Sequence, residues 1–156
     1  MTTFALGAFI NAVIDTFTNA RELKDVTIFD GPQVTGDYPE KAIAVGHDGL
    51  DFGEVTGATS QNSYKPIGPA HHMDEVGLLD CTIYANIGDS GDDAFRTCRG
   101  IAFDILSRVD TVIRADPTFG NVIQRAGLSQ TSLKYDATGQ GTGVKIVFSI
   151  SYKART

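Results

Sequence analysis

Hydrophobic and polar residues alternate most regularly near the end of the chain, over residues 144–153. Successive side chains of a strand point to opposite faces, so this alternation predicts a strand with one buried face. Residues 128–137 also have strand character, and the glycine-rich stretch 138–141 is typical of a hairpin connection. We therefore expect a C-terminal antiparallel hairpin whose last strand buries Val144, Ile146, Phe148, Ile150 and Tyr152.

Three earlier segments also have strand patterns. Residues 26–29 are followed by turn residues, and residues 42–46 are apolar throughout, which is typical of a strand buried on both faces. Residues 75–87 alternate again, and their predicted buried face consists of Gly77, Leu79, Cys81, Ile83, Ala85 and Ile87.

Apolar residues recur at steps of three and four in two segments, which indicates helices packed on a sheet. The first helix is predicted over residues 3–20, with Thr2 or Thr3 as its N-cap. The second is predicted to start at Ser90 and to end before Pro117, because the residue before a proline is pushed out of helical angles. On its outer face we expect two ion pairs between residues four apart, Asp104 with Arg108 and Asp110 with Arg114.

The order is therefore helix, two strands, long loop, strand, helix, two strands. The long loop is assigned to residues 47–74, with a small hairpin as an option around residues 50–55, and a short helical turn is expected at 121–126. Because the strands come in adjacent pairs, residues 1–156 are predicted to form a single α+β domain. Its sheet is expected to be mixed or antiparallel, with about four to five strands and two main helices on one face.

The composition is that of an ordinary globular protein, with 42% apolar and 21% charged residues. A net charge of -6 repels nucleic-acid phosphate on average, and basic residues do not cluster on any predicted element, which disfavours a nucleic-acid-binding module. No apolar run has the length of a membrane span, and we recognise no secretory signal. Cys81 and Cys98 are interpreted as reduced core residues, consistent with a reducing cytoplasm.

The chain contains few groupings that suggest chemistry. His71 and His72 are adjacent, whereas zinc ligands are usually two to four residues apart and need a second cluster. Cys98 lies between two arginines that could lower a thiol pKa, but it belongs to the apolar stripe of its helix. The acidic residues Asp48, Asp51 and Glu54 are too irregular for a calcium-binding loop. We therefore predict no catalytic set, no metal site and no cofactor.

Several segments form a pattern when taken in order. After the N-terminal amphipathic helix come Asp30-Gly31-Pro32, the stretch 39–46, a glycine-rich acidic loop, and the stretch 74–83. Ser90-Gly91-Asp92, Arg96 and Arg99 in a long helix, residues 115–120 and a final pair of strands follow. This order covers nearly the whole chain and resembles the tail terminator proteins of long-tailed bacteriophages, also called tail completion or neck proteins. It is closest to the forms in phages of actinobacteria.

The resemblance implies a structural virion protein, made in the host bacterial cytoplasm and located at the neck of the tail. Its subunits would form a homohexameric ring that caps the tail tube, ends its polymerisation and joins it to the head–tail connector protein. Genomic DNA would pass through the lumen without specific binding, with which an acidic chain agrees. The partners implied are further copies of the chain, the tail tube protein and the connector, with no membrane involved.

If the resemblance holds, the long loop is the expected docking element. The residues proposed for the interface are Asp48, Asp51, Glu54 and Tyr64 in the loop, and Arg96, Arg99 and Arg108 on the second helix. Tyr64 stands where the family has tryptophan, and Phe119 where leucine is commoner. A solvated helix face is the simpler explanation for the three arginines. Deletion of residues 50–70 is expected to leave a folded protein that no longer joins tails to heads.

Two other functions remain open. One is another phage neck or minor tail component of similar architecture. The other is a small hydrolase that uses Cys98 and a histidine, in which replacement of Cys98 would abolish activity without unfolding the chain.

Overall fold

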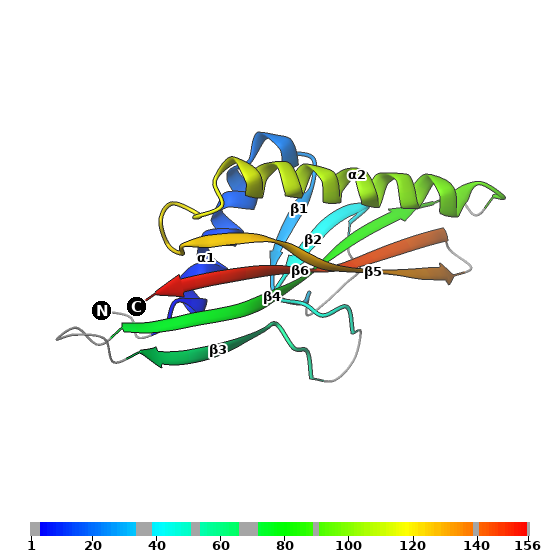
Figure 1. Cartoon of the computed structure of the whole chain (residues 1–156). Coiled ribbons are helices and arrows are strands. Elements are labelled where there is room, and N and C mark those ends of the chain that lie inside the picture. The colour runs from blue at the N-terminus through cyan, green and yellow to red at the C-terminus, as the bar shows by residue number, and fades with distance from the viewer. Residues whose placement is uncertain are drawn as a thin grey trace.

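In the computed structural model, the chain forms an α+β fold built on a single mixed sheet (Figure 1). The structure describes residues 4–33, 39–50, 54–65, 72–88, 91–138 and 141–155, apart from the side chains of residues 64, 65 and 136–138. The helices are α1 (Leu6–Asn19), the short 3-10 helix η1 (Arg21–Leu23) and α2 (Ala94–Ala115). The strands are β1 (Thr27–Asp30), β2 (Lys41–Val45), β3 (Ala58–Lys65), β4 (His72–Ile87), β5 (Arg125–Thr138) and β6 (Gly141–Arg155).

The sheet has six strands in the order β1-β2-β4-β6-β5, with β3 paired to β4 beside β2. β1 and β2 are parallel and all other pairs are antiparallel, which confirms the predicted mixed sheet. The predicted number of strands was too low, because β3 forms inside the segment interpreted as a long loop. Residues 58–65 contain few apolar side chains, so the sequence gives no buried face from which to recognise a strand.

β4 is the strand on which the sheet is assembled. One edge of β4 pairs with β6 from Asp74 to Ile87, and the other edge is divided between β3 and β2. The division falls at Asp80, whose carbonyl accepts from the amides of Gly46 and His47 and whose amide donates to the carbonyl of Gly57. The chain therefore leaves the sheet after β2 and re-enters it as β3 at a single point.

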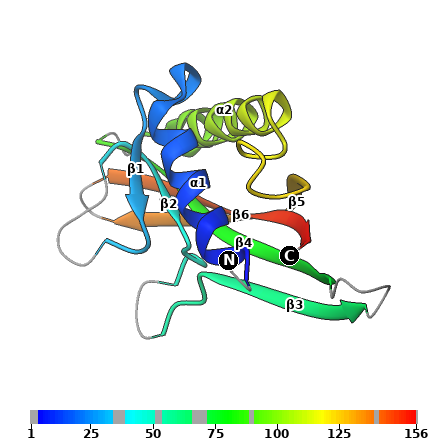
Figure 2. The same ribbon diagram turned by 90° about the vertical axis from the view of Figure 1, so that its left-hand side faces the viewer.

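Both helices cover the same face of the sheet, as predicted (Figure 2). The predicted buried faces of β4 and β6 are confirmed, and they pack with the apolar stripes of the helices into one core. In α1 this stripe buries Phe9, Val13 and Phe17 completely. At the base of α1 the ring of Phe9 contacts those of Phe119 and Tyr152, with centroids 5.3 and 4.6 Å apart. These contacts fix the position of the helix on the sheet.

The turn after α2 delivers Phe119 to this cluster. The Asp116 carboxylate accepts from the amides of Thr118 and Gly120, at 3.1 and 2.8 Å, and from the Thr118 hydroxyl. These bonds hold the pKa of Asp116 below its usual range, the Thr118 hydroxyl contributing most. The turn places Phe119 at φ 49, and the buried ring offsets this conformation, which is uncommon for a bulky side chain.

Both helix starts differ from the predictions. The N-cap of α1 is Ala5 and that of α2 is Asp93, and neither is capped by its own side chain. Instead, the Ala5 amide donates a hydrogen bond to the Glu75 carboxylate of β4 at 2.8 Å, so a side chain from the sheet satisfies a free amide at the start of α1. A sequence window cannot detect a partner seventy residues away. Thr2, Thr3 and Ser90 lie outside the described residues.

Two smaller predictions were wrong. Residues 121–124 form turns and bends, and strand β5 already begins at Arg125 where a helical turn was expected. Residues 54–57 are not in a strand, which removes the optional hairpin at 50–55 as far as its residues are described. Deletion of residues 50–70 would remove β3 and uncover the edge of β4, so it does not test a loop alone.

Gly77 tests the register of β4 against β3 and β6. A Cβ at this position would lie 2.5 Å from the Thr59 carbonyl oxygen and 2.7 Å from the Tyr152 ring, whereas one at Gly100 on α2 would meet nothing within 4 Å. Gly77→Ala is expected to lower the free energy of unfolding by about 2 kcal/mol through overpacking. Gly100→Ala should raise it by up to about 1 kcal/mol through helix propensity. Urea denaturation measures both, and equal effects would contradict the register.

Candidate interaction surface

The face of the sheet opposite the helices is the main candidate for function. We call it the open face. Its part beside β2 is covered by the described residues 46–50 and 54–57, which we call the covering segment, and this part is called the covered half. The remainder, called the bare half, is lined by Thr59, Gln61, Val76, Leu78, Arg125, Gly127, Ser151 and Lys153.

Gly49 holds the covering segment against the sheet. Its φ of 83 suits glycine, and a Cβ there would lie 2.5 Å from the Val147 side chain on β6. Its carbonyl accepts from Lys145 Nζ at 3.4 Å. Any larger residue at position 49 would push the segment off β6.

His47 anchors the same segment to β4. Its side chain is 3% exposed, and Nδ1 accepts from the amide of Gly49 at 2.9 Å. A neutral ring with Nδ1 as acceptor carries its hydrogen on Nε2, which therefore donates to the Tyr84 hydroxyl at 3.1 Å. The His47 carbonyl accepts from the Thr82 hydroxyl at 2.9 Å. The ring thus joins the loop to the sheet through both of its nitrogens.

Asp48 closes the segment on itself. Its carboxylate accepts from the amides of Leu50 and Thr56, at 3.0 and 2.9 Å. Desolvation alone would raise the pKa of Asp48, but the hydrogen bonds from the Thr56 and Leu50 amides act in the opposite direction, and the pKa is lowered. Asp48 therefore has a structural role in the loop. Its predicted interface role stays a prediction.

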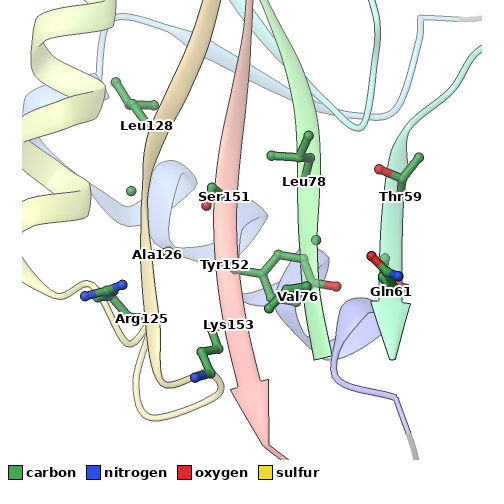
Figure 3. Close-up of a pocket in the computed structure, with 13 residues that line it drawn as sticks. Thr59, Gln61, Val76, Leu78, Arg125, Ala126, Leu128, Ser151, Tyr152 and Lys153 are labelled. Carbon is green, nitrogen blue, oxygen red and sulfur yellow. The ribbon is translucent and has the colours of Figure 1, made fainter. Parts of the chain in front are cut away.

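The bare half is a shallow groove of about 840 Å³ that crosses four strands (Figure 3). Val76 is 46% exposed and Leu78 is half-buried, and both come from β4. Arg125 on β5 and Lys153 on β6 lie opposite each other in register, and both are exposed. The groove therefore combines an apolar floor with a basic margin.

The three predicted helix arginines have different surroundings. Arg108 donates to the Glu22 carbonyl at 2.9 Å and forms ion pairs with Asp25 at 2.7 Å and Asp104 at 3.0 Å. It therefore ties α2 to the segment after α1. Arg99 donates to the Tyr135 hydroxyl of β5 at 2.9 Å.

Arg96 is exposed on α2. The structure brings none of the three arginines to the open face. The expected ion pair between Asp110 and Arg114, at 2.8 Å, is confirmed.

The remaining predicted interface residues are less defined. Glu54 is exposed at the end of the loop, and Asp51 lies outside the described residues. The backbone of Tyr64 belongs to β3, where it pairs with Met73, and its side chain is not described. An interface role for these residues stays a prediction.

Both cysteines are free and buried, as predicted. Burial raises the pKa of Cys81 to about 12 and also raises that of Cys98, whereas a nucleophilic cysteine needs a lowered pKa. Within the described residues no group of three or more His, Cys, Asp or Glu could hold a metal ion. Nor does any helix there have the length and apolarity to cross a membrane.

Sequence reasoning missed the pair formed by Arg125 and Lys153. These residues are far apart in the chain, and only the β5–β6 register brings them together. The same register sets Lys134 opposite Lys145. The alternation of the last strand identified the polar face of Lys145 and Lys153, and a hairpin register counted back from the turn would have placed Lys134.

Comparison with known proteins adds no family assignment. No protein-family model matches the chain, and no curated protein matches it.

Arg108 can be tested against Arg96, which is exposed on the same helix. Arg108→Ala is expected to lower the free energy of unfolding by about 1 kcal/mol, because it removes three contacts to partly exposed groups and some packing. Arg96→Ala should change it by less than about 0.5 kcal/mol. Urea denaturation gives both values, and a larger loss for Arg96→Ala would show that Arg108 does not hold the two segments together.

Because the Asp48 carboxylate accepts two loop amides, we expect protonation of Asp48 in acid to weaken these hydrogen bonds. Its folded-state pKa is below the ordinary 3.8, so its stabilisation is complete well above that value and is lost as pH falls through the folded pKa. Hydrogen-exchange protection of the Leu50 and Thr56 amides should therefore fall between about pH 5 and pH 2.5. In Asp48→Asn the protection should already be low and depend less on pH. The same profile in both proteins would exclude Asp48 as the cause.

Proposed function

We propose that the chain is a structural assembly protein, a tail terminator of a long-tailed bacteriophage that acts as a ring. The observation that carries the proposal is the bare half of the open face. A sheet normally covers its apolar residues, yet Val76 is 46% exposed there. The ordered series of segments that resembles tail terminators supports the same conclusion.

Self-association would cover this surface. Leu50 and Glu54 of the long loop are both exposed, Leu50 by 49%. These two residues and the bare half belong to different surfaces of one subunit, so a contact between them in neighbouring copies would be heterologous. Heterologous contacts generate rings when the rotation closes. In the proposed ring, Leu50 and Glu54 of one subunit contact the sheet of the next.

The proposed ring sits at the neck of the virion. Its partners are the tail tube protein on one side and the head–tail connector on the other, and six copies are the number that the resemblance implies. DNA passes through its lumen, and a net charge of -6 gives no counterion release to retain the phosphate backbone. The protein would be made in the cytoplasm of the host bacterium.

Native mass measured over a concentration series is the first test. We expect a discrete ring near six subunits, alone or after addition of tail tubes, whose length should then become fixed. Val76→Glu should weaken assembly by burying a charge in the contact. Thr97→Glu adds the same charge at an exposed position of α2 and should leave assembly unchanged. A monomer both alone and with tail tubes would overturn the proposal, and binding to tubes without fixing their length would indicate another neck or minor tail component.

A further inference from the structure

The first residues of β5 are bordered by a groove on each side. β5 is the last strand of the sheet and, among the described residues, pairs only with β6, so no described strand pairs with the backbone donors and acceptors of its outer edge. Residues 125–128 line the bare half of the open face and also a second groove of about 820 Å³ between β5 and α2. A strand added to this edge would place alternate side chains in the two grooves.

The groove on the helix side is suited to apolar side chains. Its apolar walls include Phe103 and Leu106 of α2, Pro117 after the helix, and Leu128 of β5. Asp110 and Arg114 also line it, and they are paired with each other at 2.8 Å. Phe103 is 41% exposed, and Leu106 is only half-buried. The α2 flank therefore extends an apolar surface beyond the sheet edge, where this chain supplies no strand to cover it among the described residues.

The groove on the open face is suited to anions. Arg125 and Lys153 face each other in register, and like charges placed opposite each other across two strands repel. Neither has an ion-pair partner in the part of the chain that the structure describes. Arg155, nearby on the same strand, is neutralised by Asp74 at 2.8 Å. The chain has a net charge of -6, yet these two cations have no ion-pair partner among its described residues, so an anion from another molecule would relieve their repulsion.

We propose that residues 125–128 of β5 accept an extended segment of a partner protein as an additional strand, and that this segment alternates acidic and apolar residues. The acidic row lies beside Arg125 and within reach of the long Lys153 side chain on the next strand, and the apolar row lies against Phe103 and Leu106. Backbone hydrogen bonds to the free edge supply affinity, and the two grooves supply specificity. A nucleic acid would use the cations but not the apolar row, which is why we infer a protein segment.

The probe is a capped seven-residue peptide of alternating leucine and aspartate, titrated into the 156-residue chain at about 0.15 M salt, an ionic strength that screens exposed charges strongly. Saturable binding with amide shifts centred on residues 125–128 is the expected result. A peptide of the same composition with its leucines and aspartates in separate blocks should bind at least tenfold more weakly. Equal binding of the two peptides would exclude the strand geometry, and no saturable binding would overturn the proposal.

Charge exchange identifies the acidic row. Lys153→Glu should weaken binding at least tenfold while preserving the fold, since it turns a repulsive pair into an attractive one. In the double variant Arg125→Glu with Lys153→Glu, an alternating leucine and lysine peptide should bind in place of the aspartate peptide. The matched control is Arg21→Glu with Lys24→Glu, two exposed charges near η1, which should leave binding unchanged.

Further outcomes separate the alternatives. Phe103→Asp should weaken binding of the alternating leucine and aspartate peptide, because it removes an apolar contact to the leucine row. Single-stranded DNA that competes fully with the peptide, or loss of binding in the control double variant, would mark a general polyanion surface and overturn the proposal. The inference does not depend on the ring, because a monomer presents the same edge. Peptide binding measured at a concentration where native mass shows the monomer therefore fails or succeeds independently of the ring.

Discussion

The pairing of β4 with β6 is the constraint on which the rest of the structure depends. It runs from Asp74 with Arg155 to Ile87 with Thr142, and it aligns the two buried faces so that both helices can pack on them. The other edge of β4 is long enough to carry two strands, and Asp80 marks the boundary between them. A one-residue slip of this pair would turn every apolar residue of one strand to the wrong face.

This arrangement leaves the molecule with two unlike sides. The helix side is closed by α1 and α2, and its aromatic cluster around Phe9 joins the start of α1, the turn after α2 and the end of β6. The opposite side depends on a loop for partial cover. The bonds of His47 and Asp48 hold this loop over only half of the face. The other half stays exposed, and both the proposed ring contact and the acidic side of the proposed added strand use it.

The charges of the chain are distributed in the same unequal way. On the helix side, Arg108 is engaged within the subunit, between α2 and the segment after α1. On the open face, register places basic residues opposite one another, as with Arg125 and Lys153. Repulsion of this kind slightly destabilises an isolated subunit and is relieved by an acidic partner. The acidic composition alone gave no indication of a basic surface on the open face.

The sequence alone determined the two main helices, five of the six strands, the buried faces of β4 and β6, and the free state of the cysteines. These features follow from local periodicity, because a side chain's face is set by its position along its own helix or strand. Only the tertiary structure decided that residues 58–65 form strand β3 and that Glu75 accepts a hydrogen bond from the start of α1. It also decided that His47 anchors the loop and that Arg125 lies opposite Lys153 at the start of β5. Each of these depends on a contact between residues distant in the chain. Such contacts are set by strand register and packing, and no local pattern carries that information.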